Sequence, residues 1–565
     1  MALRRAAQRR KNTRFQGRGT PPRGAVSPAS LISSDAHKAP GFASHLASRA
    51  GEPVQRQIGE CAKAIAADLD RSRVSLVMVF CSEQHATDYG EVVGSIQSEF
   101  PSNPKVAGIS SSGVIGAYQE SENEQTISLL ATTLPPEHVS VFTLDSNSMP
   151  DLDASQSEWL KAIGSLSAGS DSNDTIVTFA DSAFQRNLQD ALNGMKFALP
   201  NANIVGGLVG GGFERRALFY HDGISRGGYY RNTAALVGVL LEGVDTETVV
   251  AQGASPVVEG EPREFEVIEH KQSLIESMRD TLTGKTMTPL EALKLELERV
   301  DDERRQEVAQ ALLVSVTPSL AASESLTASA VAAAAGYSSS SMTPPLPPEE
   351  DEEDDSGDIS SENEASEEQA SALSSESRTG QQGESSSGQS AAGAPAESNE
   401  TAWLVRPIAG MNPNEGAMAL GERVFPGMRL RFMARDRKSA VRDVRERFSE
   451  LKRADLERAL DGTSSSSRGL VGGLQISCNG RGFNLFQEAG FDVRHFSEAR
   501  PLPLAGFFAG GEIAPVVHGG QAYLHGFTSV FCSFSVPKSG KVDGEREESE
   551  ERNTTSVNDR DDSDS

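Results

Sequence analysis

The chain has 565 residues, and its 80 acidic against 53 basic side chains give a formal charge of −27. This balance argues against a nucleic-acid partner, which requires a basic surface, and the lack of any run of about 18 apolar residues predicts no membrane span. Four cysteines are too few for a disulfide framework and no CxxC pair indicates zinc, so we expect a reducing, intracellular environment.

The N-terminal segment is basic. Residues 1–34 contain eight Arg or Lys side chains and no acidic one. Such a composition resembles an organelle transit peptide, and a disordered basic arm is the other interpretation. We therefore expect residues 1–51 to be disordered or removed. The chain would act in a chloroplast or mitochondrion if this segment is a transit peptide, and otherwise in the cytoplasm.

From residue 55 onward the sequence alternates between helix and strand patterns. The β-branched apolar run at 74–80 is typical of a strand that is buried on both faces. Helical periodicity precedes it at 55–70 and follows it at 86–100, and Pro101 ends the second helix. A small-residue strand and turn follow at 105–116. Further strands are expected at 127–132 and 138–144.

The same order then recurs twice. In the second copy we predict a strand at 175–180, a helix at 185–198, a Gly-rich strand and turn at 203–212, and strands at 218–223 and 234–243. In the third copy we predict strands and turns at 471–482 and 503–515, and one closing strand at 524–536. The spacing from Phe80 to Gly108, from Phe179 to Gly207 and from Cys478 to Gly506 is 28 residues in each case. Equal spacing and order indicate internal duplication. The predicted fold class is α/β (α+β): mixed sheets with packed helices and three related β-α-β-β units.

Two segments carry most of the excess acid. Residues 349–400 hold 16 acidic side chains against Arg378 alone, and residues 541–565 hold 10 against 4 basic ones. Acidic, Ser-rich composition buries too little apolar surface to fold, so we predict a disordered insert at 313–400 and a disordered tail at 538–565. The insert is either a spacer or a phosphorylated switch. Residues 290–312 are predicted to form one amphipathic helix leading into it.

Several motifs resemble the FIST family. The segments LVMVFCS (76–82), VAGISSSGVIG (106–116) and VGGLVGGG (205–212) are similar to the FIST N domain. The segments SCNGRG (477–482) and PLAGFFAGGEIAPV (503–516) are similar to the FIST C domain. The resemblance implies a FIST N domain over 52–312, with two of the units, and a FIST C domain over 401–537, with the third.

The resemblance also implies a function. FIST modules are sensory domains in signal transduction, and amino acids or similar metabolites are their expected ligands. Some relatives carry an F-box and recruit substrates for ubiquitin ligation, and some bacterial relatives bind haem. Here only about 55 mostly basic residues precede the FIST region, which is too short and too polar for an F-box. We expect a non-catalytic, small-ligand-sensing protein. The alternatives are a substrate-recruiting adaptor with a protein partner in ubiquitin-dependent turnover, and a Cys-dependent enzyme.

Small-residue segments follow the helix in each unit, at 107–113, 206–212 and 505–511. Glycines in strands mark close approach of backbone or ligand, so the segments either face a shared ligand cleft or let sheets cross closely. The candidate ligand-binding residues are in these segments and beside them: Ser110, Ser111, Ser112, Gly113, Gly207, Gly210, Gly211, Cys478, Asn479, Arg481, Gly506, Gly510, Glu512 and His525.

Within this set, Arg481 could grip a carboxylate and Glu512 could accept an amine, which together would clamp an amino acid. The alternative is that the two pair with each other. Cys478, Glu512 and His525 form a nominal catalytic set, but a Cys also stands at the matching place in the first unit, Cys81, which favours a structural role. No cofactor or metal is expected. Haem, with His221 or His525 as ligand, is the alternative.

Overall fold

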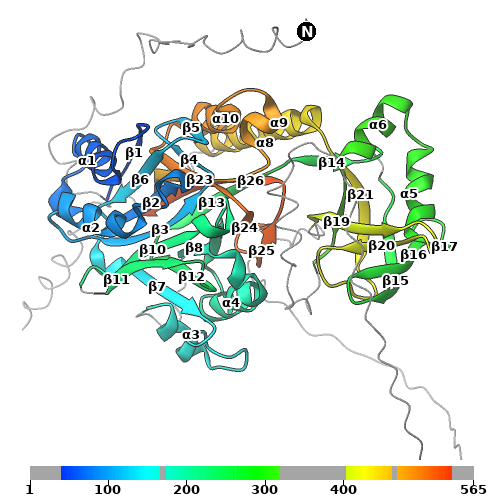
Figure 1. The fold of residues 1–565 in the computed structure, drawn as a ribbon, viewed down its shortest axis with the longest axis horizontal. Helices are drawn as coiled ribbons and strands as arrows, with labels where there is room; N and C mark the ends of the chain where they lie inside the picture. The colour runs from blue at the N-terminus through cyan, green and yellow to red at the C-terminus, as the bar shows by residue number, and fades with distance from the viewer. Residues whose placement is uncertain are drawn as a thin grey trace, which may run out of the picture. The chain divides into compact units, whose positions relative to one another are not determined.

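The computed structural model describes residues 40–165, 173–224, 226–260, 262–318, 403–460 and 468–537 (Figure 1). The predictions for the basic N-terminus up to residue 39, for most of the acidic insert and for the C-terminal tail lie outside these residues. Within the described part of the chain, no helix is long and apolar enough to cross a membrane.

Three units with the same order of elements make up most of the fold. The first unit contains β1 (Phe42–Ser48), α1 (Val54–Ile65), β2 (Leu76–Ser82), α2 (Tyr89–Glu99), β3 (Lys105–Ser111), β4 (Gly113–Gly116), β5 (Gln119–Glu122) and β6 (Thr126–Thr132). The second contains β7 (Val139–Asp145), α3 (Gln156–Ala162), β8 (Thr175–Ala180), α4 (Gln185–Ala198), β9 (Asn203–Leu208), β10 (Ala217–His221), β11 (Gly227–Arg231) and β12 (Ala235–Leu241). The third contains β13 (Asp245–Gln252), α8 (Arg437–Leu460), β22 (Arg468–Cys478), α9 (Gly482–Phe486), α10 (Phe491–Ala499), β23 (Leu504–Ala509), β24 (Gly511–Pro515), β25 (Ala522–His525) and β26 (Thr528–Pro537). The predicted triplication is therefore confirmed, and the mixed α/β class with it.

Each unit builds one six-stranded mixed sheet with the same strand order. The orders are β1-β6-β2-β3-β10-β11, β7-β12-β8-β9-β24-β25 and β13-β26-β22-β23-β4-β5. In every sheet the third and fourth strands are the parallel pair and the other neighbours are antiparallel. The last two strands of each sheet are a hairpin that comes from a different unit. Because the first unit lends its hairpin to the third sheet, the third to the second and the second to the first, the three units are interlocked in a ring.

The inner faces of the three sheets share one core, and the helices cover the outer faces. Strand β2 illustrates this: Leu76, Met78 and Phe80 belong to the central core, whereas Val77 and Val79 pack under α1 and α2. Burial on both faces explains the continuous apolar run that predicted this strand. At the centre, the rings of Phe80, Phe179 and Phe507, one from each sheet, lie with centroids 5.6 to 5.9 Å apart.

Glycine in the second parallel strand is a steric requirement. A Cβ atom on Gly108, Gly206 or Gly506 would overlap the backbone carbonyl oxygen of Val79, Thr178 or Gln475 on the neighbouring strand. These register partners are the equivalent positions of the three units, and they are 29, 28 and 31 residues apart. The constant spacing of 28 therefore compared positions that are not equivalent, although the duplication that it indicated is real.

A closed antiparallel barrel interrupts the third unit. Its strands are β15 (Phe265–Lys271), β16 (Leu274–Asp280), β20 (Ala417–Leu420), β19 (Leu404–Asn412), β18 (Leu312–Val316) and β21 (Arg429–Arg435), and β18 pairs back onto β21 to close the ring. Short β14 (Ala254–Pro256) pairs with the end of β21, and β17 (Thr286–Met287) pairs with β16. Each of the six strands of the ring has a neighbour on both sides, and the apolar inner side chains form a core of their own.

Four boundary predictions need correction. Strand β1 lies inside the segment predicted to be disordered, and β18 lies inside the predicted insert. The predicted helix over 290–312 is two helices, α5 (Pro289–Leu297) and α6 (Asp302–Gln310), because Asp301 caps a new helix by accepting a hydrogen bond from the Arg304 N–H at 2.8 Å. The single closing strand predicted at 524–536 is also two strands, β25 and β26, which belong to different sheets.

The predicted division between the two FIST parts also changes. Strand β13 begins the third unit before the barrel, although it lies within the range predicted for the first two units. The chain on either side of residues 319–402 meets in the β18–β19 pair, where Val316 lies opposite Leu404. The two parts are therefore joined by shared sheets and do not form separate domains.

Candidate functional site

Arg481 and Glu512 do not form the predicted clamp. The Arg481 side chain is fully buried, and its Nε and Nη2 atoms donate to the Asp492 carboxylate at 2.7 and 2.9 Å. Glu512 is also fully buried and accepts hydrogen bonds from the N–H and Oγ1 of Thr528 at 3.1 and 2.7 Å. The alternative prediction, that Arg481 pairs with Glu512, is also wrong, because Arg481 pairs with Asp492.

The nominal catalytic residues are buried and poorly suited to nucleophilic chemistry. Burial, and then the nearby charge of Glu512, raise the pKa of the Cys478 thiol to about 12, so it is protonated at neutral pH. His525 donates from Nε2 to the Ala514 carbonyl at 3.0 Å, and burial lowers its pKa to about 4. Burial raises the pKa of Glu512 to about 8, against the hydrogen bonds from Thr528. The thiol of Cys81, in the first unit, is likewise buried with a raised pKa.

Most of the predicted small residues hold the sheets together. Ser110 Oγ accepts from the Ala217 N–H at 2.7 Å, and Ser111 Oγ donates to the Phe508 carbonyl. Gly113, Gly207 and Gly506 each lie where a Cβ would collide with a neighbouring strand or ring. For these residues, the prediction that sheets cross closely describes the structure.

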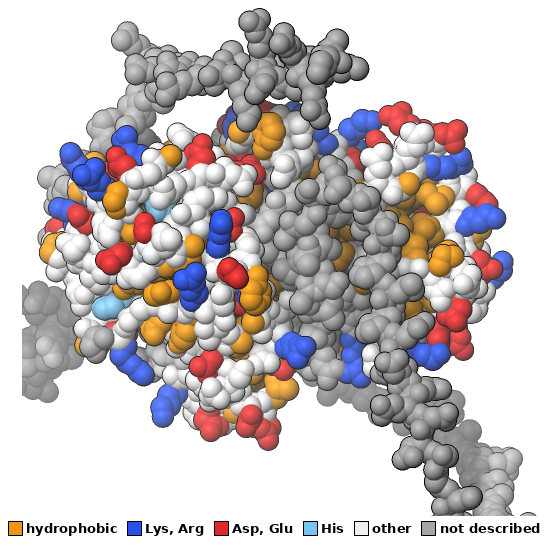
Figure 2. Space-filling view, in the orientation of Figure 1, with side chains coloured by type: hydrophobic (Ala, Val, Ile, Leu, Met, Phe, Trp, Pro, Cys, Tyr) orange, Lys and Arg blue, Asp and Glu red, His pale blue; other side chains and the backbone are white. Residues whose placement is uncertain are grey.

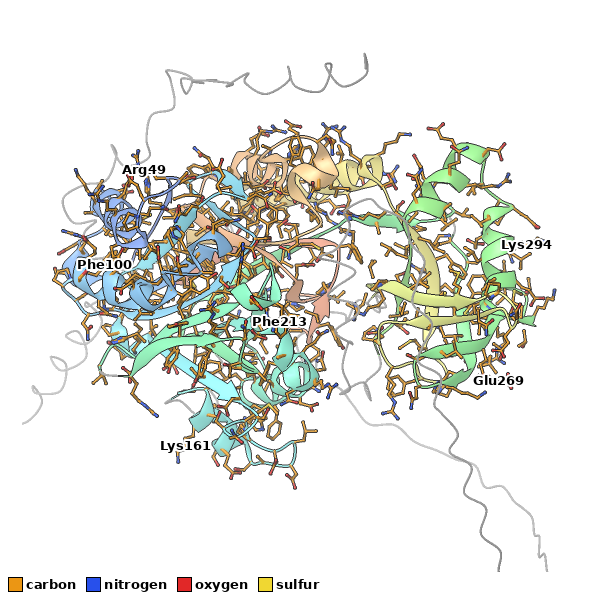
Figure 3. All side chains as sticks on the ribbon, in the orientation of Figure 1. Arg49, Phe100, Lys161, Phe213, Glu269 and Lys294 are labelled. Carbon is orange, nitrogen blue, oxygen red and sulfur yellow. The ribbon has the colours of Figure 1, made fainter. Side chains whose placement is uncertain are left out.

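Some of the predicted ligand-binding residues do lie together, around one cavity. A cavity of about 330 Å³ is lined by Ser112 from the first unit, Gly211 from the second and Asn479 from the third, so all three small-residue segments or their partner strands reach it. Gly210 packs against the Asn479 side chain. Figure 3 labels Phe213, the residue that directly follows Gly211 and Gly212 of the cavity lining. Ser112, Gly211 and Asn479 each follow a strand of a parallel pair, and the carboxyl ends of such strands are where open α/β sheets bind their ligands.

Two acidic residues that sequence reasoning missed also line this cavity. Glu83 Oε2 accepts from the Gly212 N–H at 2.7 Å, and Glu122 Oε1 accepts from the Phe483 N–H at 2.8 Å. Each of these carboxylates, both from the first unit, is therefore bonded to a turn amide of another unit. We call this the acidic cavity, and we expect it to favour a cation.

Burial shifts the pKa of one of these two carboxyl groups. It raises the pKa of Glu122 above the usual range, although the Phe483 N–H opposes the shift. A cation bound beside Glu122 would compensate this desolvation. One signal in the sequence could have identified Glu83: each unit places an acid or amide directly after its first parallel strand, at Glu83, Asp181 and Asn479.

A second cavity, of about 370 Å³, lies against the first. It is lined by Arg435, Asp436 and Arg437 at the junction of β21 and α8, and by residues of the β22–α9 turn and of the barrel. Arg435 donates to the Gly480 carbonyl, and its guanidinium lies 5.6 Å from the centroid of the Phe527 ring. We call this the basic cavity. Asn479 and Asn484 line both cavities.

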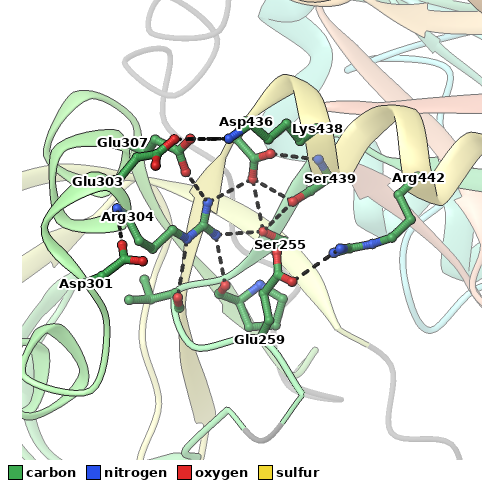
Figure 4. Close-up of polar contacts among 12 residues, drawn as sticks. Ser255, Glu259, Asp301, Glu303, Arg304, Glu307, Asp436, Lys438, Ser439 and Arg442 are labelled. Carbon is green, nitrogen blue, oxygen red and sulfur yellow. Dashed lines mark hydrogen bonds and ion pairs between the residues drawn. The ribbon is translucent and has the colours of Figure 1, made fainter.

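A network of polar side chains fixes the junction that carries Arg435 and Arg437 (Figure 4). Arg304 of α6 donates to Asp436 at 3.0 Å and to Ser255 of β14 at 2.8 Å, and Ser439 of α8 donates to Asp436 at 2.6 Å. The network therefore ties the barrel to the first turn of the long helix of the third unit.

The described residues contain no cluster of three or more His, Cys, Asp or Glu side chains that could hold a metal ion. Of the two histidines considered for haem, His221 accepts from the Gly223 N–H at 3.0 Å and His525 is buried. On the face shown in Figure 2, acidic and basic side chains of the described residues are interspersed.

Three interlocked α/β units with an inserted barrel define the class of the fold, a mixed α/β protein. The chain belongs to the FIST family: the FIST N domain model matches residues 75–270, and the FIST C domain model matches residues 368–515. FIST domains are sensory modules that bind small ligands in signal transduction.

Mycobacterial proteins without an assigned function are among the relatives. Uncharacterized proteins of two Mycobacterium tuberculosis strains, CDC 1551 and H37Rv, are 38% identical over 133 residues, which are 23% of this chain and 31% of theirs. An uncharacterized protein of Mycobacterium bovis is 35% identical over 133 residues, with the same shares. The chain thus matches about a third of the length of these curated relatives.

Proposed function

We propose that this protein is a non-catalytic signalling sensor, and that its small ligand carries an ammonium or related cationic group that binds in the acidic cavity. The observation that carries the proposal is that Glu83 and Glu122 both line a cavity to which all three units contribute. A volume of about 330 Å³ is at the lower end of the range of small-molecule sites.

Three features support a role in binding without catalysis. The Cys478 thiol is buried, and its raised pKa disfavours the thiolate that a Cys-dependent enzyme needs. Each carboxylate of the acidic cavity is fixed by a backbone N–H, so the site is organised before the ligand arrives. The lining comes from segments far apart in the chain, so ligand binding would stabilise the contacts between units.

A thermal-shift screen of the full chain tests the proposal. Butylamine and amino acids should raise the melting temperature and butanoate should not. A ligand at 100 times its Kd stabilises by about 2.7 kcal/mol. Glu83→Gln and Glu122→Gln keep an oxygen for the backbone N–H but lose the charge, and they should abolish the shift. Glu124→Gln, on an exposed residue two positions from Glu122, is the matched control and should retain it. Equal shifts in all three variants would overturn the proposal.

A further inference from the structure

The two cavities are adjacent and carry opposite charge. Asn479 and Asn484 line both, so the acidic and the basic cavity are neighbours that share part of their walls. Glu83 and Glu122 line only the first, and Arg435 and Arg437 line only the second. The amide groups of the asparagines can hydrogen-bond the uncharged part of a ligand that passes them.

The basic cavity keeps its positive character although Asp436 is part of its wall. The Asp436 carboxylate accepts hydrogen bonds from Arg304, from Ser255 and from the backbone and side chain of Ser439, at 2.6 to 3.1 Å (Figure 4). Arg304, which does not line the cavity, therefore offsets part of this charge, since it also pairs with Glu307 at 3.0 Å. Arg437 is exposed, and Arg435, which also lines the cavity, donates to the Gly480 carbonyl, so the exposed guanidinium group of Arg437 is the one that can attract an anion.

We propose that a single ligand occupies both cavities, with an ammonium group in the acidic cavity and a carboxylate in the basic one. This inference rests on the proposed function and specifies its ligand class. In a free α-amino acid the two charged groups are on one carbon atom, so they cannot reach acids and arginines that line separate cavities. The ligand is therefore a longer zwitterion, such as an ω-amino acid or a short peptide, whose charged ends are several bonds apart.

A chain-length series measures this requirement. Thermal shifts and Kd values of the full chain would be compared for glycine, β-alanine, 4-aminobutanoate, 6-aminohexanoate and triglycine, with hexylamine and hexanoate as singly charged controls. Affinity should rise with the separation of the charges, and the best zwitterion should bind at least about tenfold more tightly than either control.

Substitutions in each cavity test which charged end of the ligand binds there. Arg437→Gln should weaken the best zwitterion at least about tenfold and leave hexylamine unchanged, whereas Glu83→Gln should weaken both. Arg445→Gln, on an exposed arginine two turns further along α8, is the matched control and should change neither. Arg435→Gln, with its melting temperature checked first, is the second test of the anionic end.

The outcomes separate the two proposals. If hexylamine binds as tightly as every zwitterion and Arg437→Gln has no effect, the two-cavity ligand is wrong while the acidic-cavity sensor stands. If glycine binds more tightly than the longer zwitterions, the length requirement is wrong. If hexanoate alone binds and depends on Arg437, the spanning ligand and the cationic sensor both fail.

Discussion

Arg481 and Asp492 form a bidentate ion pair in the interior of the third unit, with Nε–Oδ2 and Nη2–Oδ1 distances of 2.7 and 2.9 Å. Both side chains are at most 1% exposed, and the Arg481 guanidinium lies 5.1 Å from the centroid of the Phe486 ring. The pair joins the turn after β22 to the first turn of α10. It therefore positions Asn479, which precedes it by two residues and lines both cavities.

Removing one member of this pair should destabilise the fold strongly. Arg481→Ala leaves Asp492 buried without its cation, and we expect a loss of about 3 to 5 kcal/mol in the free energy of unfolding. Urea unfolding followed by tryptophan fluorescence and circular dichroism measures it. Arg49→Ala removes an ion pair with Glu60 in which the two side chains are 54% and 40% exposed, and it should change stability far less. Equal effects of the two variants would contradict the structural role of Arg481.

The sequence alone predicted the helices and strands that have a clear apolar pattern. Helix α4 was predicted with its observed bounds, since its apolar residues repeat on one face, and β2 and β8 were predicted because both faces of each are buried. The barrel was missed because its strands, such as β15 and β16, mix apolar with charged residues and form no continuous apolar run. No local pattern indicates that β18 pairs with β21 more than a hundred residues away.

The candidate site was predictable only in part. The sequence indicated that the small-residue segments either line a cleft or let sheets cross closely. It could not indicate which residues do which, because that depends on the exchange of hairpins between units. Ser112 and Asn479 reach the acidic cavity, whereas Ser111, in the same motif, is bonded across a sheet crossing. Glu83 and Glu122 were missed because an acid in a turn ordinarily faces water, and only the tertiary structure turns these two inward.

The position of Gly506, at a sheet crossing, should accept no side chain. In Gly506→Ala the added Cβ would overlap the Gln475 carbonyl oxygen, a backbone atom that cannot move without breaking the β22–β23 pair, so we expect a loss of about 3 kcal/mol. Gly94→Ala is the matched control. Gly94 is exposed in the middle of α2 with open space around it, so the alanine should stabilise by up to about 1 kcal/mol. Thermal and urea unfolding of both variants would show opposite signs, and a neutral Gly506→Ala would contradict the packing argument.

The Arg304 network should matter more than the exposed ion pairs beside it. The Arg304 and Asp436 side chains are 13% and 8% exposed, so Arg304→Ala leaves a largely buried carboxylate without its cation and should cost about 3 kcal/mol. Because the network ties the barrel to α8, calorimetry should also resolve a separate, earlier transition in this variant. Lys438→Ala removes a contact to Glu303 in which both side chains are 78% exposed, and it should leave stability nearly unchanged. A single transition at the original temperature in Arg304→Ala would exclude this role.

Glu512 should make the folded state less stable as pH rises. Burial raises its pKa from 4.5 to about 8, so between these values the folded chain binds one proton more at this site than the unfolded chain. Its contribution to stability is therefore complete below pH 4.5 and is lost as pH rises to about 8, at about 1 kcal/mol per pH unit. Glu512→Gln removes the titration, so the stability difference between variant and wild type should move in favour of the variant across this window. Unfolding of both proteins measured from pH 5 to pH 8 checks this, and a stability difference that stays constant over the window would contradict it.

Ligand binding should release a proton from Glu122. Because burial raises the pKa of this carboxyl, part of the free protein carries the proton in mildly acidic solution, and a bound ammonium favours the ionised form. Affinity for a cationic ligand should consequently fall as pH decreases through the raised pKa, approaching a tenfold loss per pH unit below it. Isothermal titration in buffers of different ionisation enthalpy would count the released proton. Glu122→Gln should bind weakly and without this pH dependence, and Glu124→Gln should reproduce the wild-type profile. A wild-type affinity that is constant from pH 4.5 to pH 8 would place the cationic group of the ligand away from Glu122.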